Sequence, residues 1–242
     1  MIKSAKYEQE QFEKNISGTS FLANKMKCEY ISTKEINLGN FYTLNDCGIM
    51  IMGENVSLCG DFTEDDLETI LSFCQFIGVY GLETERDDLP IKTRRALYLM
   101  EYRGESGEAN ADIIRNDNIY GFSEFCCNNF PGSAFSTVYS YFARKVNKGI
   151  SDIYYLIDNR KIVSGAVATR YGGNTLYITF VSTDRRYRRK GLSATVIKHI
   201  VASNPGRRIV LMCEEELEPF YSKLGFVHSD NIYLYTLREE NI

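Results

Sequence analysis

Histidine is scarce in this chain, since only His199 and His228 occur among its 242 residues. A Ser-His-Asp or Cys-His catalytic group needs an imidazole beside its nucleophile, and the sequence shows no such constellation. The scarcity of histidine, together with the absence of any CxxC pair, also argues against a zinc site. We therefore expect no metal, and we interpret His199, which falls inside a predicted helix, as structural.

Long apolar runs are absent as well. No stretch of about eighteen apolar residues occurs, so we expect no membrane span. The first residues, MIKSAKYEQEQFEKN, lack the apolar core of a secretory signal. The seven cysteines, an odd number, are interpreted as reduced and mostly buried residues of a cytoplasmic protein. A net charge of -4 argues against nucleic-acid binding by bulk electrostatics.

The composition that remains is that of a globular protein, with 44% hydrophobic and 25% charged residues. Its length allows one large domain or two small ones. The Gly- and Glu-rich segment from Gly104 to Asn110 lacks apolar periodicity, so we place a domain boundary there. We expect an N-terminal α+β domain of unknown role at 1–105 and a second domain at 109–242.

The N-terminal half predicts short strands followed by a helix. Alternating apolar residues and turn residues predict strands at about 38–44, 47–52, 55–60, 76–82 and 95–102. Thr63 is expected to cap a helix over about 64–74. Residues 1–35 are polar and predicted to be helical in part.

The C-terminal half predicts a mixed sheet with helices, which belongs to the α+β class. In chain order we expect a strand at 111–115, helices at 122–129 and 133–146, strands at 151–157, 162–171 and 175–183, a helix at 192–203, a strand at 208–213, a short helix at 217–223 and a strand at 231–237. Pro131-Gly132 is expected to separate the first two helices.

The stretch from Leu176 to Ile200 combines a strand, a basic loop, Gly191 and a helix. The first turn of a helix has unpaired backbone N–H groups and partial positive charge, and a glycine lets a bulky anion approach. This order of elements favours a phosphate site. A solvated charged loop is the alternative interpretation, and a nucleic-acid patch is a weaker one.

Two motifs stand out in this half, RRKGLS at Arg188 to Ser193 and EPFYSKLGF at Glu218 to Phe226. Both resemble motifs of the GNAT acyltransferase superfamily. Arg188-Arg189-Lys190-Gly191-Leu192-Ser193 resembles its pyrophosphate-binding motif, whose usual form is Gln/Arg-x-x-Gly-x-Gly/Ala, with Ser193 as a departure. Glu218 to Phe226, EPFYSKLGF, resembles the family's Phe/Leu-Tyr-x-Lys-x-Gly-Phe segment. The predicted order of elements over about 109–242 is also that of the family.

The resemblance implies a cofactor site for acetyl-coenzyme A or another acyl-coenzyme A between two splayed parallel strands, 175–183 and 208–213. It implies that the backbone of Val181, Ser182 and Thr183 bonds the pantetheine arm. It further implies that backbone amides cradle the pyrophosphate, with basic side chains such as Arg188 near the outer phosphates. These amides belong to Arg189, Lys190, Gly191, Leu192, Ser193 and Ala194.

Tyr221 occupies the position where the family keeps a phenol that donates a hydrogen bond or proton to the leaving sulfur. The alternative is a core tyrosine, since the chain has 17 tyrosines. Glu214 and Leu217 stand where family members often have Asn and Ala. The strand 175–183 lacks a carboxylate base, so Glu124, Glu214, Glu215 or a water relay stay open as the proton acceptor.

Two functions from different classes follow. One is a cytoplasmic N-acyltransferase that moves an acetyl group to a small-molecule or peptide amine, without a covalent acyl-enzyme. The other is a catalytically inactive, coenzyme A-binding regulatory or scaffolding protein. The N-terminal half is either a degenerate copy of the same fold or an unrelated α+β domain. In either case the roles open to it are to cover the acceptor pocket, to form a homodimer, or both. Its acidic helix start, Glu64-Asp65-Asp66, predicts that it holds no second cofactor.

Overall fold

The structure, a computed structural model, describes residues 1–33, 40–91, 93–105, 107–110, 112–130, 132 and 134–237. It forms two compact units. Unit 1 comprises Met1–Leu99 and Asp230–Ile242, and unit 2 comprises Met100–Ser229. No helix in the described ranges has the length and apolar character that crossing a membrane requires.

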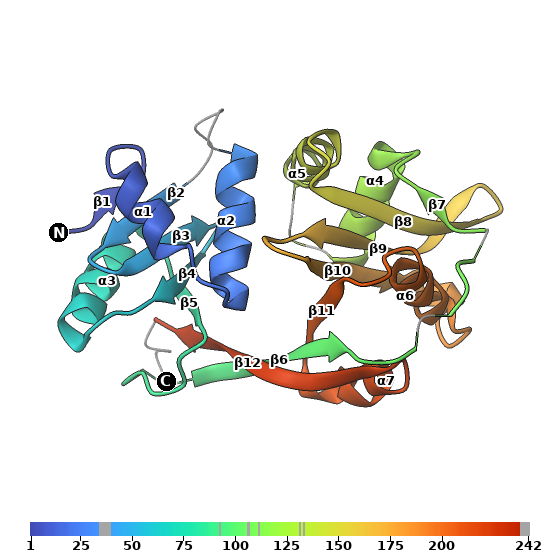
Figure 1. Ribbon diagram of the computed structural model, residues 1–242. Coiled ribbons are helices and arrows are strands. Elements are labelled where there is room, and N and C mark those ends of the chain that lie inside the picture. Colours follow the sequence, from blue (N-terminus) through green and yellow to red (C-terminus); the bar gives the residue numbers. More distant parts are fainter. Residues whose placement is uncertain are drawn as a thin grey trace, which may run out of the picture. The chain divides into compact units, whose positions relative to one another are not determined.

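Unit 1 is a sheet with helices (Figure 1). Its strands lie in the order β1-β2-β3-β4-β5, followed by β12 (Phe226–Thr236), and only β4 and β5 among the first five pair in parallel. The elements are β1 (Lys3–Ser4), α1 (Gln9–Asn15), α2 (Phe21–Thr33), β2 (Asn40–Leu44), β3 (Cys47–Met52), β4 (Asn55–Gly60), α3 (Glu64–Ile77), β5 (Gly81–Thr84) and β6 (Thr93–Tyr102).

Unit 2 has the strand order β6-β11-β10-β9-β8-β7. Here too, β10 and β11 pair in parallel, and the strands before them pair antiparallel. The elements are β7 (Ile114–Arg115), α4 (Ile119–Asn129), α5 (Phe135–Asn147), β8 (Ser151–Asp158), β9 (Lys161–Arg170), β10 (Thr175–Thr183), α6 (Leu192–Ala202), β11 (Arg208–Cys213), α7 (Glu218–Ser222) and β12 (Phe226–Thr236).

Helices cover both faces of the unit 2 sheet. Successive side chains of a strand point to opposite faces. On β8, Tyr154 contacts the ring of His199 from α6, whereas Tyr155 contacts the ring of Phe122 from α4. α4 and α6 therefore lie on opposite faces. The apolar core on the α4 side contains Phe122, Phe125, Phe142, Ile153, Tyr155 and Val167, all buried.

The two units repeat one order of elements. The series β1-α1-α2-β2-β3-β4-α3-β5 in unit 1 matches β7-α4-α5-β8-β9-β10-α6-β11 in unit 2. A parallel pair also falls at the same place in each series, β4–β5 and β10–β11. This agreement favours a degenerate copy of one fold over an unrelated N-terminal domain.

The strand that follows each series lies beside the last strand of the other series: β12 lies beside β5, and β6 lies beside β11. β5 of unit 1 pairs antiparallel with β12, from the end of the chain, through Gly81–Thr84 and Tyr233–Thr236. In unit 2 the neighbour of β11 is β6, and Arg208 of β11 pairs with Glu101 of β6 at 2.8 Å. The boundaries of the compact units therefore differ from those of the expected domains at 1–105 and 109–242, which stay a prediction.

Most predicted elements are present, with differences at their ends. The predicted strand at 76–82 is wrong at its start, because α3 continues to Ile77 and β5 begins at Gly81. The strand expected at 231–237 begins at Phe226. The expected strand start at Ala111, Pro131 between the helices and the helix start at Ser133 lie outside the described residues.

Candidate active site

β10 and β11 form a fork. They pair in parallel from Thr175 to Ile178 on β10 and from Arg208 to Leu211 on β11, and the pairing stops there. β10 continues to Thr183 and β11 to Cys213. Leu176 and Ile178 are buried, whereas every residue from 179 to 183 is half-buried. The sequence predicted this separation from the family resemblance alone.

A β-bulge lies in the arm of the fork that β10 forms. Thr179 pairs with Val167 and Ser182 with Gly165, so two residues of β10 face one of β9. Phe180, the first of the two, has φ of 52°, in the left-handed region that bulky residues rarely adopt. The bulge turns the end of β10 just where its pairing with β11 stops.

Backbone groups beyond the bulge divide between the two edges of β10. The N–H of Asp184 donates to Val163 of β9 at 2.9 Å, and the carbonyl of Ser182 accepts from the Ser164 hydroxyl at 3.1 Å. Since a strand directs alternate residues to opposite edges, Val181 and Thr183 direct their backbone groups to the open edge. Ser182 thus faces β9, and its two neighbours face the fork.

The basic loop after β10 is held by its own side chains. Asp184 caps a 3₁₀ turn at Arg185–Tyr187, and hydrogen bonds from Arg186 hold the pKa of the Asp184 carboxyl below its usual range. The Tyr187 hydroxyl donates to Asp158 at 2.7 Å, and Lys190 lies over the Tyr187 ring at 5.0 Å from its centroid. These contacts fix the loop against the turn between β8 and β9.

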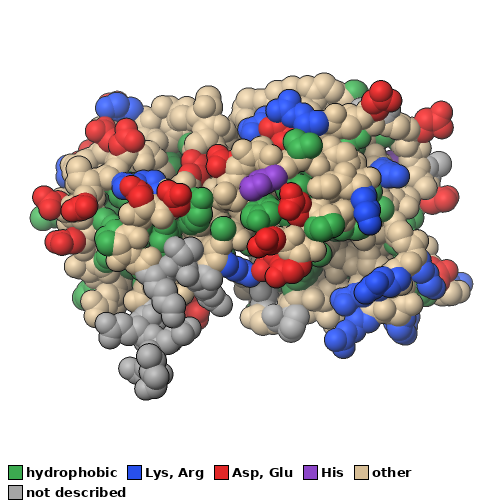
Figure 2. Space-filling model, turned by 90° about the horizontal axis from the view of Figure 1, so that it is seen from below, with side chains coloured by type: hydrophobic (Ala, Val, Ile, Leu, Met, Phe, Trp, Pro, Cys, Tyr) green, Lys and Arg blue, Asp and Glu red, His purple; other side chains and the backbone are tan. Residues whose placement is uncertain are grey.

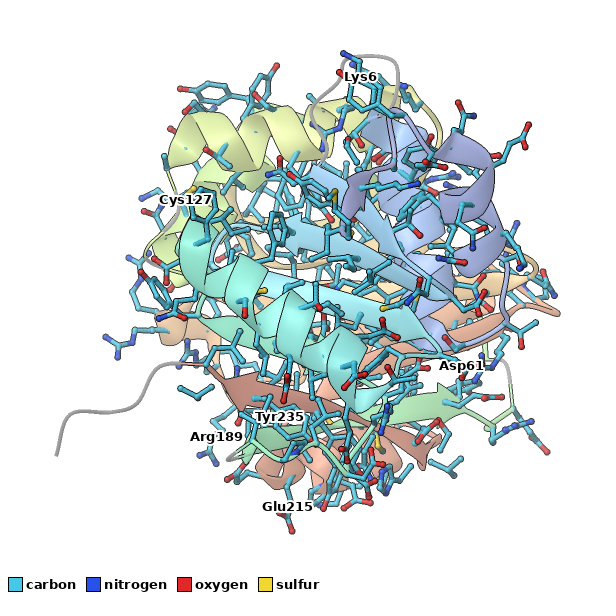
Figure 3. The ribbon with its side chains drawn as sticks, turned by 90° about the vertical axis from the view of Figure 1, so that its left-hand side faces the viewer. Lys6, Asp61, Cys127, Arg189, Glu215 and Tyr235 are labelled. Atoms are coloured by element: carbon cyan, nitrogen blue, oxygen red, sulfur yellow. The ribbon has the colours of Figure 1, made fainter. Side chains whose placement is uncertain are left out.

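Arg188, which is predicted near the outer phosphates, contacts the end of β10 in the structure. Its Nε donates to the carbonyl of Thr183 at 3.2 Å, so this side chain joins the loop to the end of β10. Arg185 and Arg189 are exposed. Lys and Arg side chains gather on one part of the surface of unit 2 in Figure 2, and Figure 3 labels Arg189, which projects outward.

The start of α6 is open to an anion. Its N-cap is Gly191, at φ of 75°, and no side chain caps the helix. The N–H of Thr195 bonds to the carbonyl of Gly191, so the N–H groups of Leu192, Ser193 and Ala194 lie before the first helical bond. A Cβ built on Gly191 meets no atom within 4 Å. This geometry can hold a phosphate on backbone amides.

Unit 1 differs at the equivalent helix start. Thr63 caps α3 through its side chain, and Asp66 returns a bond to the backbone N–H of Thr63 at 3.1 Å, which completes a capping box. Glu64, Asp65 and Asp66 occupy the first turn. The N–H groups of Thr63 and Asp66 are thus already used, and the negative charge of the first turn is unfavourable for an anion.

Tyr221 of α7 is 6% exposed and packs edge-on against Phe226. Burial, with a smaller effect of the Cys213 thiol, raises the pKa of Tyr221 to about 12. Burial also raises the pKa of Cys213, the last residue of β11, to about 11. The phenol and the thiol are therefore neutral neighbours at the end of one arm of the fork.

The carboxylates proposed as bases are exposed to solvent. Glu124 of α4 is exposed, as are Glu214 and Glu215 after β11. Glu215 points outward from the ribbon in Figure 3. Burial lowers the pKa of His199, which packs on Tyr154 and belongs to the α6 face rather than to the fork.

The fork, the loop and Tyr221 all belong to unit 2. Two residues beside them were missed. Phe180 carries no sequence signal for its left-handed backbone, because phenylalanine in an apolar strand normally predicts regular pairing. Cys213 was grouped with the other buried cysteines, although its place at the end of a strand that borders the fork could have singled it out.

Comparisons with known proteins agree with this geometry. Residues 121–234 match the family described as "Acetyltransferase (GNAT) domain". Serotonin N-acetyltransferase of Mesocricetus auratus is 39% identical over 61 residues, which are 24% of this chain and 30% of that protein. The chain thus spans less than a third of this relative's length.

Two solved structures share the fold at low identity. A GCN5-related N-acetyltransferase from Kribbella flavida is 11% identical, with a TM-score of 0.64 over 90% of this chain and 96% of that chain. A tandem GNAT protein from the clavulanic acid biosynthesis pathway is 10% identical, with a TM-score of 0.52 over 84% of this chain and 80% of that chain. The C-terminal part of this chain is an acetyltransferase domain of the GNAT superfamily.

Proposed function

We propose that unit 2 is an N-acyltransferase that moves an acetyl group from acetyl-coenzyme A to an amine acceptor in a ternary complex. The observation that supports this best is the fork of β10 and β11, followed at once by the uncapped start of α6. A fork offers backbone groups to an extended arm, and the helix start offers N–H groups to a pyrophosphate.

In this proposal the open-edge groups of Val181 and the backbone N–H of Thr183 bind the pantetheine arm, since the Thr183 carbonyl already accepts from Arg188. Ser182 supports that edge, because its carbonyl already accepts from Ser164. Arg188 braces the loop through Thr183, so Arg185 and Arg189 are the better partners for the outer phosphates. The pyrophosphate binds to the backbone amides of Arg189, Lys190, Gly191, Leu192, Ser193 and Ala194.

Tyr221 would act on the leaving sulfur. The amine nitrogen attacks the thioester carbon, the tetrahedral intermediate collapses, and the carbon–sulfur bond breaks to give a thiolate. A phenol with a pKa of about 12 is a much weaker acid than a thiol, whose reference pKa is about 8.5. Tyr221 therefore stabilises the thiolate as a hydrogen-bond donor more readily than it protonates it.

The amine must also lose a proton. Because Glu124, Glu214 and Glu215 are exposed, we favour water that relays this proton to solvent over a buried base. The acceptor class proposed is a small-molecule or peptide amine. The matched relative's printed name, serotonin N-acetyltransferase, is that of an enzyme with an amine acceptor.

A second candidate is a coenzyme A-binding protein without catalysis. It is favoured by the absence of a carboxylate from the sequence of β10 and by the exposure of the other candidate bases. It predicts binding of coenzyme A without acetyl transfer to any amine in a broad panel. A robust transfer that Tyr221→Phe abolishes would exclude it.

The decisive experiment is calorimetric titration of coenzyme A and acetyl-coenzyme A into wild type, Gly191→Asp and Gly191→Asn. Aspartate and asparagine have the same shape, and both tolerate the left-handed backbone. We expect micromolar binding to wild type, loss of binding in Gly191→Asp and partial retention in Gly191→Asn. Failure of wild type to bind either compound would overturn the proposed function.

The remaining parts of the proposal concern location and partners. All seven cysteines are free thiols, which suits a reducing compartment, and we propose a cytoplasmic location on this ground. Formation of a homodimer and the lack of nucleic-acid or membrane partners stay predictions.

A further inference from the structure

The turn between β8 and β9 has an arginine where such a turn ordinarily has glycine. Asp158 of β8 pairs with Lys161 of β9, so Asn159 and Arg160 form a two-residue turn. Their φ values are 48° and 62°, and a hairpin turn with positive φ at both positions favours Asn-Gly. A residue with a Cβ pays a conformational cost there. The Arg160 side chain is exposed, and no ion pair within the described residues accounts for its presence.

Contacts on both sides of this turn hold it beside the basic loop before α6. The Tyr187 hydroxyl donates to the Asp158 carboxylate at 2.7 Å. Lys161, on the strand after the turn, lies close enough to Asp184 to contribute to the lowered pKa of that carboxyl. The turn therefore borders the loop 184–190, whose last residues lead into the uncapped start of α6.

The equivalent turn of unit 1 also lies at a helix start. In the repeated order of elements, β2, β3 and α3 correspond to β8, β9 and α6. Asn45 and Asp46 form the two-residue turn between β2 and β3. The side-chain amide of Asn45 donates to Asp66, in the first turn of α3, at 2.6 Å. Unit 1 thus shows that this fold brings the hairpin turn into contact with the start of the helix.

The charge of each turn follows that of the helix start beside it. In unit 1 the turn contributes Asp46, and α3 begins with carboxylates that repel an anion. In unit 2 the turn region contributes Arg160 and Lys161, and α6 begins without a side-chain cap. The two copies share the hairpin but not its charge. The basic side chains of the β8–β9 turn are therefore not required by the fold, and they belong with the anion site.

We propose that the β8–β9 turn is part of the cofactor site and that Arg160 binds the 3′-phosphate of coenzyme A. The inference rests on the proposed function for the positions of the pantetheine and the pyrophosphate. Each phosphate of the pyrophosphate is a diester with one negative charge, whereas the 3′-phosphate is a monoester that approaches two charges at pH 7. Cations suit such a group better than backbone amides do. Tyr187 and Asp158 are positioning residues, because they hold the turn against the loop.

The test is calorimetric titration of coenzyme A and of 3′-dephospho-coenzyme A, which lacks only that phosphate. Wild type should bind coenzyme A about tenfold more tightly, and Arg160→Gly should lower this ratio about fivefold, the effect of one exposed ion pair. The affinity for 3′-dephospho-coenzyme A should stay unchanged. Glycine accepts the φ of 62°, so the melting temperature of Arg160→Gly should be no lower than that of wild type. Arg160→Lys should keep most of the ratio.

Tyr187→Phe tests how the turn is held. This variant removes the hydroxyl that donates to Asp158 and keeps the ring, so it should also lower the ratio between the two compounds. In the Arg160→Gly background it should have no further effect on the ratio, because both residues act through one contact with the ligand. A residue that only stabilises the loop would instead lower the affinity for both compounds in either background.

Lys198→Gln is the matched control, since it also removes one positive charge, from an exposed position on α6. Its ratio should equal that of wild type. An unchanged ratio in Arg160→Gly, or equal binding of the two compounds by wild type, would overturn the inference and leave the proposed function standing. Failure of wild type to bind either compound would overturn both.

Discussion

At the scale of single residues, Tyr221 is the side chain to which we assign the proposed role at the leaving sulfur. Its phenol is buried beside Cys213, and its pKa of about 12 keeps it protonated over the working range of most enzymes. The phenol stays protonated below its raised pKa, and the protonated form is lost only as the pH rises through that value. Ionisation of Tyr221 therefore cannot limit the reaction below about pH 11.

For Tyr221→Phe we expect kcat to fall about 100-fold with little change in KM, because one hydrogen bond to the leaving thiolate is lost. The pH profiles of wild type and variant should be parallel up to about pH 10. Steady-state acetyl transfer measured from pH 6 to 10 checks both points. An alkaline fall in wild type that Tyr221→Phe removes would contradict the assigned pKa.

Gly165 is a second residue whose identity matters, and here the reason is space. The Cβ of Gly165→Ala would overlap the Phe122 ring and the backbone of β8. We expect this variant to lose about 1–3 kcal/mol of unfolding free energy. Denaturant titration measures it.

Gly107→Ala is the control, since a Cβ there meets nothing within 4 Å. It should be neutral or slightly stabilising. Equal stability of the two variants would mean that α4 can move away from the sheet at little cost.

At the scale of elements, the parallel pair β4–β5 of unit 1 differs from the fork of β10 and β11 in unit 2. An ion pair between Lys25 and Glu83, which is mostly shielded from solvent, lies at the end of the β4–β5 pairing. Ser57 of β4 pairs with Glu83 of β5 at the last paired position. The Glu83 carboxylate accepts from both Lys25 of α2 and Ser57 at 2.5 Å. These contacts connect α2 to both β4 and β5, so side chains hold the two strands together at the end of their pairing.

This cluster predicts an acid-sensitive stability. Burial alone would raise the pKa of Glu83, but Lys25 and Ser57 outweigh it and hold the pKa below its usual range. A lowered pKa stabilises the folded state above the unfolded value, about 4.3, and the stability is lost as the pH falls through the folded value.

Glu83→Gln should lose about 3 kcal/mol at pH 7, because the half-buried Lys25 ammonium loses its partner. It should also show a flatter loss of stability below about pH 4.3 than wild type. Chemical denaturation between pH 3 and 7 measures both effects. Glu54→Gln, at an exposed turn of the same unit, should follow wild type; a wild-type slope in Glu83→Gln would contradict the assignment.

Element types were largely predictable from the sequence, but several ends and local geometries were not. Thr63 signalled its helix, and the structure confirms the cap. The end of α3 was missed because Phe76 and Ile77 have the composition of a strand. Gly78, at φ of 74°, ends the helix instead. The bulge at Phe180 was not predictable, since phenylalanine in an apolar strand normally predicts regular pairing.

At the scale of the whole molecule, the chain is a repeated fold whose final strands are exchanged. Hydrophobic periodicity and turn residues predict where strands lie in the sequence, but they do not predict which strands pair with one another in the sheet. The last strand of the chain was therefore expected within the second domain. Its pairing with β5 depends on contacts between residues about 150 positions apart, for which local sequence carries no signal.

The exchange predicts that unit 1 depends on residues at the far end of the chain. Tyr235 of β12 is 1% exposed, and its hydroxyl donates to the carbonyl of Arg86 at 2.9 Å. Tyr235→Ala should lose about 3–5 kcal/mol and speed amide exchange in β3, β4 and β5. Tyr7→Ala, which removes a ring that is 80% exposed, is the control and should have little effect.

Truncation after Ser229 is the stronger form of this test. It removes the part of β12 that pairs with β5, so we expect rapid amide exchange throughout unit 1. Full protection of unit 1 in the truncated chain would contradict the exchange of strands.

The exchange also affects the order in which the protein can be made. The first ninety-nine residues emerge from the ribosome long before Asp230 to Thr236 are synthesised. During that interval β5 can pair with β4 on one edge, but its other edge lacks β12. Unit 1 must then wait, with an open strand edge on β5, until β12 has been synthesised. Unit 1, most of which is synthesised first, is therefore the unit whose sheet is completed last.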